Sequence, residues 1–86
     1  MSTQIDNLIR LLEFLVAQKR DDLGYAWVVN DNVQAGLGLS PAVVNDEVKL
    51  AESRGYVNVR KEIGTPPFTF HSVTITAEGR LWLEEK

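Results

Sequence analysis

The chain has 86 residues, with 12 acidic and 9 basic side chains and a formal net charge of −3 at pH 7. This length suits one small domain, and a hydrophobic content of 44% is that of an ordinary globular protein. The absence of cysteine excludes disulfides, thiolate catalysis and thiolate metal sites, and the single histidine, His71, excludes most other metal chemistry. No segment resembles a signal peptide or offers the roughly 20 apolar residues of a membrane span. We therefore expect a soluble, cytoplasmic protein that has no cofactor and is not an enzyme.

The N-terminal third of the chain predicts a helix followed by a short strand. A helix is expected over Ile5–Arg20. Leu11 and Phe14 make its apolar stripe wider than one core-facing side requires. Asp21–Gly24 interrupts the pattern, and the aromatic and β-branched residues of Tyr25–Val29 favour a strand. The stripe itself has the i, i+3, i+4, i+7 spacing of one helical face: Ile5, Leu8, Ile9, Leu12, Leu15 and Val16.

Two helices are predicted in the middle of the chain. A very short one is expected over Val33–Leu37, after the turn-forming run Asn30–Asn32. Ser40 offers an N-cap for the next helix with Pro41 at its first position, and Gly55 marks its C-terminal end. The apolar positions between them follow at i, i+4 and i+7: Val44, Val48 and Ala51.

The C-terminal part predicts two strands and a last helix. Polar and apolar residues alternate over Tyr56–Glu62 and again over Phe70–Thr76. The connection Ile63–Thr69 contains a glycine and two prolines and has the length of a hairpin loop. A short helix over Ala77–Glu85 follows. Because no linker or repeat interrupts the chain, we expect one α+β domain over residues 1–86.

This order of elements resembles the winged helix-turn-helix superfamily of DNA-binding domains. The resemblance rests on the turn and helix from Gly38 to Gly55, the helix exit Ala51–Val57, and the strand-to-helix passage Thr74–Arg80. It implies a three-helix core, a wing of two to three strands and a short C-terminal helix. The sequence departs from the family at one point: where the second and third helices cross, members usually have a small residue, and this chain has Gln34.

The resemblance also implies where DNA would bind. In the family, the helix that corresponds to residues 40–54 enters the major groove, and the wing at residues 60–69 lies on the DNA backbone. On this helix, Asn45 is a candidate to bind adenine and Lys49 to reach guanine or a phosphate. The helix carries one lysine against three acids (Asp46, Glu47 and Glu52), whereas Arg54–His71 has three cations against one acid. The candidate DNA-binding residues are Ser40, Ala42, Val43, Asn45, Lys49, Arg54, Arg60, Lys61 and Thr65.

A second function remains open, because the winged-helix fold also occurs in modules that bind proteins. The acidic balance of the chain and the apolar side chains of Val43 and Leu50 on the outer helix face favour this alternative. For the aromatic residues Tyr25, Trp27, Tyr56 and Trp82, core or rim positions compete with a stacking platform for single-stranded nucleic acid. His71 is interpreted as a structural or surface histidine.

Self-association is a further expectation. DNA-binding regulators commonly dimerise on paired half-sites. Leu11 and Phe14 on the first helix and Leu81 on the last are apolar residues beyond those that the core requires. Together they predict a homodimer patch.

Overall fold

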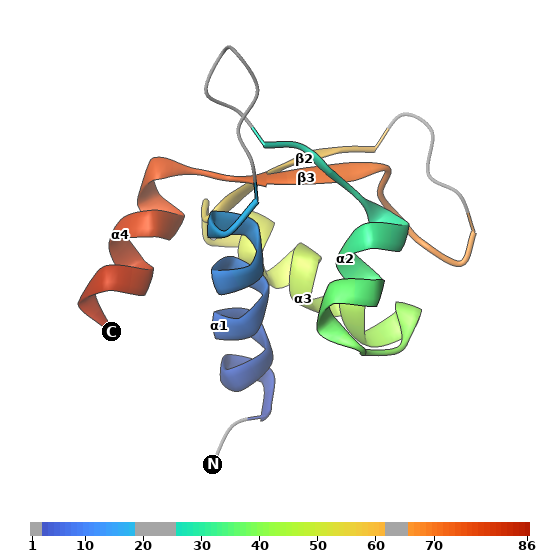
Figure 1. Cartoon of the computed structure of the whole chain (residues 1–86), viewed down its shortest axis with the longest axis horizontal. Coiled ribbons are helices and arrows are strands. Elements are labelled where there is room, and N and C mark those ends of the chain that lie inside the picture. The colour runs from blue at the N-terminus through green and yellow to red at the C-terminus, as the bar shows by residue number, and fades with distance from the viewer. Residues whose placement is uncertain (1–2, 19–25, 62–65) are drawn as a thin grey trace.

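A computed structural model describes residues 3–18, 26–61 and 66–86 of the chain. The described strands form an antiparallel sheet in the order β1-β3-β2, and the four described helices lie on one side of it (Figure 1). The domain is therefore α+β, as predicted. The elements follow in the order α1 (Thr3–Val16), β1 (Val28–Val29), α2 (Asn30–Leu37), α3 (Pro41–Ser53), β2 (Val57–Arg60), β3 (Ser72–Ile75) and α4 (Ala77–Glu85).

Helix α1 forms the centre of the core. It contacts α2, α3, α4 and β3, so its apolar stripe is covered from several directions. Leu11 is consequently 0% exposed, and our expectation that it contributes to an exposed dimer patch is wrong. The helix ends at Val16, earlier than predicted, and the predicted end at Arg20 lies outside the described residues. The buried leucines of α1 are Leu8, Leu11, Leu12 and Leu15.

Helix α2 begins three residues earlier than the sequence predicted. Asn30 belongs to a run that we interpreted as a turn, yet it is only 3% exposed and starts the helix. Its Nδ2 donates a hydrogen bond to the Phe70 carbonyl (2.8 Å), and its backbone N–H donates to the His71 carbonyl (3.0 Å). Since both donors bond to the chain just before β3, Asn30 attaches the start of α2 to the sheet.

Helix α1 also packs closely on α2. The half-buried ring of Phe14 lies against Gly36, where there is no room for a Cβ atom. Phe14 therefore belongs mainly to the α1–α2 contact rather than to a free apolar surface.

The turn between α2 and α3 is fixed by hydrogen bonds. Gly38 adopts the left-handed conformation (φ 67°), and its N–H donates to the Gln34 carbonyl at 2.8 Å. The Gln34 side chain donates to the Leu39 carbonyl at 3.1 Å. Gln34, the point of departure from the winged-helix pattern, thus stabilises the turn itself.

Helix α3 agrees closely with its prediction. Ser40 is the N-cap and accepts a hydrogen bond from the Val43 N–H at 3.4 Å, and Pro41 occupies the first helical position. Gly55 follows the helix with a φ of 78°, which only glycine adopts without strain. The predicted apolar positions are all buried: Val44, Val48 and Ala51.

The two predicted C-terminal strands are confirmed but shorter. Strand β2 pairs with β3 in a register that places Val59 opposite Val73 and Arg60 opposite Ser72. Val73 is fully buried, and Val59 packs against the core. Because successive side chains alternate across a strand, Arg60 points to the face of the sheet opposite the helices.

Candidate functional site

A groove separates the outer face of α3 from β2 and the segment before β3. Its volume is about 310 Å³, and its lining combines an apolar floor with charged side chains from both walls. This is the place where the resemblance put the DNA-binding helix beside the wing. The lining residues are Asn45, Asp46, Val48, Lys49, Glu52, Val59, Lys61, Thr69 and Phe70.

The Asn45 side chain extends from α3 across this groove and forms hydrogen bonds with the segment before β3. Its Nδ2 donates to the Pro67 carbonyl at 2.9 Å, and its Oδ1 accepts from the Thr69 N–H at 3.1 Å. To bind adenine, the amide would need these same two atoms. In this conformation Asn45 therefore joins α3 to the segment before β3, and its binding to adenine stays a prediction.

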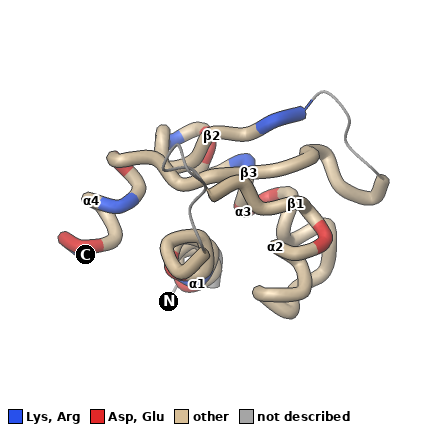
Figure 2. The backbone as a smooth tube through the Cα atoms, turned by 45° about the horizontal axis from the view of Figure 1, so that its top comes forward, with Lys and Arg blue, Asp and Glu red and all other residues tan. Residues whose placement is uncertain are grey.

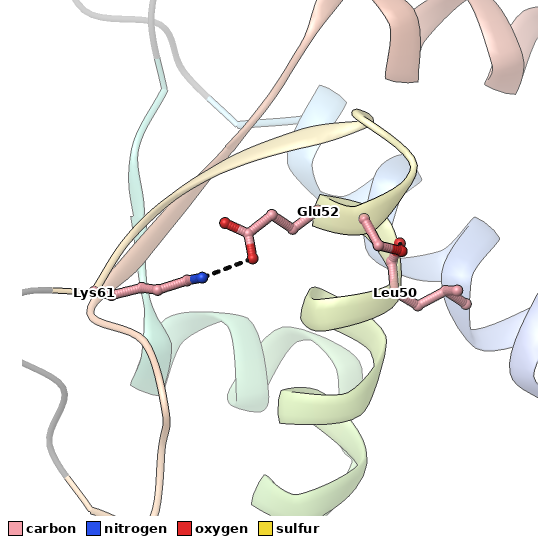
Figure 3. Close-up of polar contacts among 4 residues, drawn as sticks. Leu50, Glu52 and Lys61 are labelled. Atoms are coloured by element: carbon pink, nitrogen blue, oxygen red, sulfur yellow. Dashed lines mark hydrogen bonds and ion pairs between the residues drawn. The ribbon is translucent and has the colours of Figure 1, made fainter.

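Lys61 lies at the end of β2 and faces α3. Its Nζ forms an ion pair with the Oε1 of Glu52 at 2.9 Å (Figure 3). The two side chains remain 60% and 35% exposed, respectively, so the pair lies at the groove mouth and not in the core. Thus one of the predicted phosphate-binding cations already has an acidic partner from the same domain.

Arg60 occupies a different surface from Lys61. Its guanidinium lies over the ring of Trp27, 3.9 Å from the ring centroid. Trp27 immediately precedes β1, at the other edge of the sheet. From the sequence we considered Arg60 and Lys61 together as one basic pair, whereas in the structure their side chains point to opposite faces of the sheet. Figure 2 shows basic residues at the end of β2, but of Arg60 and Lys61 only Lys61 lines the groove.

Lys49 is the exposed cation of α3. Among the described residues it has no hydrogen-bond or ion-pair partner. Ala42 is also exposed on this helix, whereas Val43 and Leu50 are half-buried and not fully exposed as expected. Arg54 is exposed at the C-cap, and the Ser40 hydroxyl is used in N-capping. The candidate Thr65 lies outside the described residues.

Glu47 is the feature of α3 that our sequence analysis missed. We counted it among the three acids of the helix that oppose DNA binding, but it is only 3% exposed. Its Oε2 is buried and has no hydrogen-bond partner within the described residues. Burial, with a smaller contribution from the charge of Asp46, raises the pKa of Glu47 above the ordinary value for a glutamate. Its position three residues after Val44 and four before Ala51 was the signal that placed it on the buried face.

The burial of Glu47 changes the charge of the candidate interface. With Glu47 inside, the α3 side of the groove presents Asp46 and Glu52 against Lys49, and Lys61 adds a second cation from β2. The described groove therefore has no net charge, with two acids and two cations. The helix as counted from the sequence has one lysine against three acids.

The other candidate residues lie away from the groove. The rings of Tyr56 and Trp82 stack on each other with centroids 5.1 Å apart, between the start of β2 and α4. His71 is exposed, and its Nδ1 lies 3.3 Å from the Ser72 hydroxyl oxygen. Tyr25 is outside the described part of the chain. Trp27, Tyr56 and Trp82 therefore do not form one continuous stacking surface.

Comparison with protein-family models, with curated proteins and with solved structures found no match to this chain. Within the described residues, no helix has both the length and the apolar character needed to cross a membrane. The same ranges contain no group of three or more histidine, aspartate or glutamate side chains placed to hold a metal ion.

Proposed function

We propose that this chain is a winged helix-turn-helix domain. The order α1-β1-α2-α3-β2-β3-α4, with β1 added to the edge of the β2–β3 hairpin, supports this proposal. The short turn at Gly38–Ser40 between α2 and α3 supports it as well. In such a domain, α3 is the recognition helix and the connection between β2 and β3 is the wing.

We further propose that the domain binds double-stranded DNA and acts as a transcriptional regulator. The observation that carries this proposal is the free outer face of α3, which borders the groove to β2. Ala42, Asp46 and Lys49 are exposed there, while the opposite face of the helix fills the core. The step from this arrangement to DNA binding is made by analogy with the fold. Lys49 and Lys61, which both line the groove, supply the cations for phosphate contacts.

Salt-dependent DNA binding tests this function directly. The protein is titrated into a fluorescently labelled mixed-sequence duplex, and anisotropy is measured at several salt concentrations. We expect affinity to fall steeply as salt rises, because phosphate contacts release condensed counterions. Lys49→Ala should weaken binding to all duplexes and reduce the salt slope by about 1. Lys86→Ala, at the exposed end of α4, is the matched control and should bind as the wild type does.

A protein-binding module is the second candidate, and the neutral groove favours it. Its mixed acidic and basic rim over an apolar floor formed by Val48, Val59 and Phe70 resembles a polar protein contact more than a cationic DNA surface. If no duplex binds at low salt, this candidate replaces the first. The module would then bind its partner through the same groove, and Lys49→Ala would alter that interaction.

A further inference from the structure

The contact between Glu52 and Lys61 joins the two walls of the groove. Glu52 is in the last turn of α3, and its carboxylate extends across to the Lys61 ammonium just beyond β2 (Figure 3). No other ion pair connects the described residues. Asp46, the other acid of the groove, has no such partner there.

A DNA phosphate that enters the groove meets this pair. The useful donors along its path are the two lysines, Lys49 and Lys61, but Lys61 is already occupied. An ion pair with such exposed partners is weak in water, so a phosphate can replace the carboxylate. After that exchange, Glu52 remains beside the phosphate and repels it. Both effects lower the affinity for DNA.

We propose that Glu52 restrains the DNA affinity of this domain by competing with phosphate for Lys61. This inference rests on the proposed DNA-binding function. Glu52 acts through Lys61 and is a positioning residue that need not touch DNA itself. Of the two lysines of the groove, Lys61 is therefore paired with Glu52. Only a ligand that replaces the Glu52 carboxylate forms a contact with the Lys61 ammonium.

The test combines Glu52→Gln with Lys61→Met, which keeps the aliphatic stem and removes the charge. Mixed-sequence duplex binding is measured by anisotropy over a range of salt concentrations for the wild type, both single variants and the double variant. We expect Glu52→Gln to bind up to about 5-fold more tightly, the range that a surface ion pair can contribute. The salt slope should become steeper by at most about 0.9, because Lys61 would then contact phosphate in every complex and not only where phosphate has replaced the carboxylate. Most of this gain should disappear in the double variant.

Asp46→Asn is the matched control, because it also removes one negative charge from the same groove. General repulsion of phosphate should make its effect the same with or without Lys61→Met, so the two changes should be additive. Only Glu52 should be coupled to Lys61. Thermal unfolding of each variant checks that the fold is intact, since exposed charges contribute little to stability.

The outcomes separate this inference from the function on which it rests. If duplex binds, and Glu52→Gln neither tightens binding nor steepens the salt slope, the inference is wrong and the DNA-binding function stands. A gain that persists fully in the double variant also overturns it, because Lys61 would then not mediate the effect. If no variant binds duplex at low salt, the DNA-binding function and the inference are both wrong.

Discussion

The backbone of Gly79 in α4 packs directly against the carbonyl oxygen of Tyr56, leaving no space for a side chain between them. The same carbonyl accepts a hydrogen bond from the Thr76 N–H at 2.9 Å. The Thr76 hydroxyl accepts from the Gly79 N–H (3.1 Å) and donates to the Gly55 carbonyl (2.6 Å). The N-terminal turn of α4 therefore packs on the turn between α3 and β2, through contacts with Gly55 and Tyr56.

Gly79→Ala should destabilise the fold. A Cβ at this position would meet the Tyr56 carbonyl oxygen and approach the Ile75 Cγ1 to 2.9 Å, and the backbone oxygen cannot rotate away. Overpacking of this kind costs about 1–3 kcal/mol, more than the gain of about 1 kcal/mol that alanine brings to a helix. Urea unfolding measures the loss, and near-ultraviolet circular dichroism reports the Tyr56–Trp82 stack. Glu84→Ala, exposed in the last turn of α4, should change neither signal.

Asn45→Ala should lower stability by about 1–2 kcal/mol, because two hydrogen bonds to the segment before β3 are lost. Asn45→Asp should have a smaller effect, since its carboxylate still accepts from the Thr69 N–H while the donor to Pro67 is gone. Hydrogen exchange at the Thr69 amide distinguishes the two variants. A wild-type exchange rate in Asn45→Ala would contradict the tethering role.

Glu47 should make the domain less stable as the pH rises. Its pKa is raised in the folded protein from an ordinary value of 4.5, so the folded state holds this proton more tightly than the unfolded state. The folded state therefore binds more protons between the two pKa values, and the free energy of unfolding falls as the pH rises through that interval. Glu47→Leu should consequently raise stability at pH 7, by an amount of order 1 kcal/mol, and remove this part of the pH dependence.

Urea unfolding from acidic to neutral pH tests the role of Glu47. Asp46→Asn is the control: it removes only the smaller, coulombic cause of the shift and should weaken the pH dependence without abolishing it. Equal pH profiles for the wild type and Glu47→Leu would show that this carboxyl is solvated.

The sequence predicted the fold class well because most signals were local. The N-cap Ser40, Pro41 and the left-handed Gly55 all act within one turn, and each is where the pattern placed it. The errors concern contacts between elements. Leu11 is buried because several elements converge on α1. The sequence also did not indicate that Asn45 contacts a segment 22 and 24 residues away. The spacing did carry a signal for Leu11, which lies three residues after Leu8 and four before Leu15, but none for the contacts of Asn45.

For the two cations at the end of β2, the sequence likewise predicted the local geometry but not the contacts with other elements. Alternation along β2 separates Arg60 from Lys61, and this follows from the strand period that the sequence already displayed. The partners of these two cations, Trp27 and Glu52, depend on sheet order and helix packing.

Arg60 and Lys61 should therefore differ in DNA binding. Lys61→Met removes a groove cation and should weaken duplex binding and flatten its salt dependence. Arg60→Met removes the cation over Trp27, on the opposite face, and should change tryptophan emission more than DNA affinity. Anisotropy and fluorescence measured on the same samples separate the two effects. Equal losses of affinity would mean that both faces of β2 contact the duplex.

Self-association of the domain remains a proposal, now centred on α4. Of the three residues that suggested a dimer, Leu11 is buried and Phe14 packs on α2, but Leu81 is 56% exposed. Glu78, Glu84 and Glu85 surround it on the exposed side of the helix, so two copies that meet there would repel each other electrostatically. Salt screens this repulsion, and we expect a dimer to strengthen as ionic strength increases, the opposite of the trend for DNA binding.

Sedimentation equilibrium at low and high salt decides whether Leu81 mediates a dimer. The wild type should move from 9.6 kDa toward twice that mass as protein and salt concentrations increase. Leu81→Ser should remain at 9.6 kDa while its helical circular dichroism is unchanged, because the side chain lies outside the core. Leu11→Ser serves as the contrasting variant: it should unfold the protein, since it places an unpaired hydroxyl and a cavity at the centre of the core. A wild-type mass that stays at 9.6 kDa under all conditions would show that a single exposed leucine among acids does not hold two copies together.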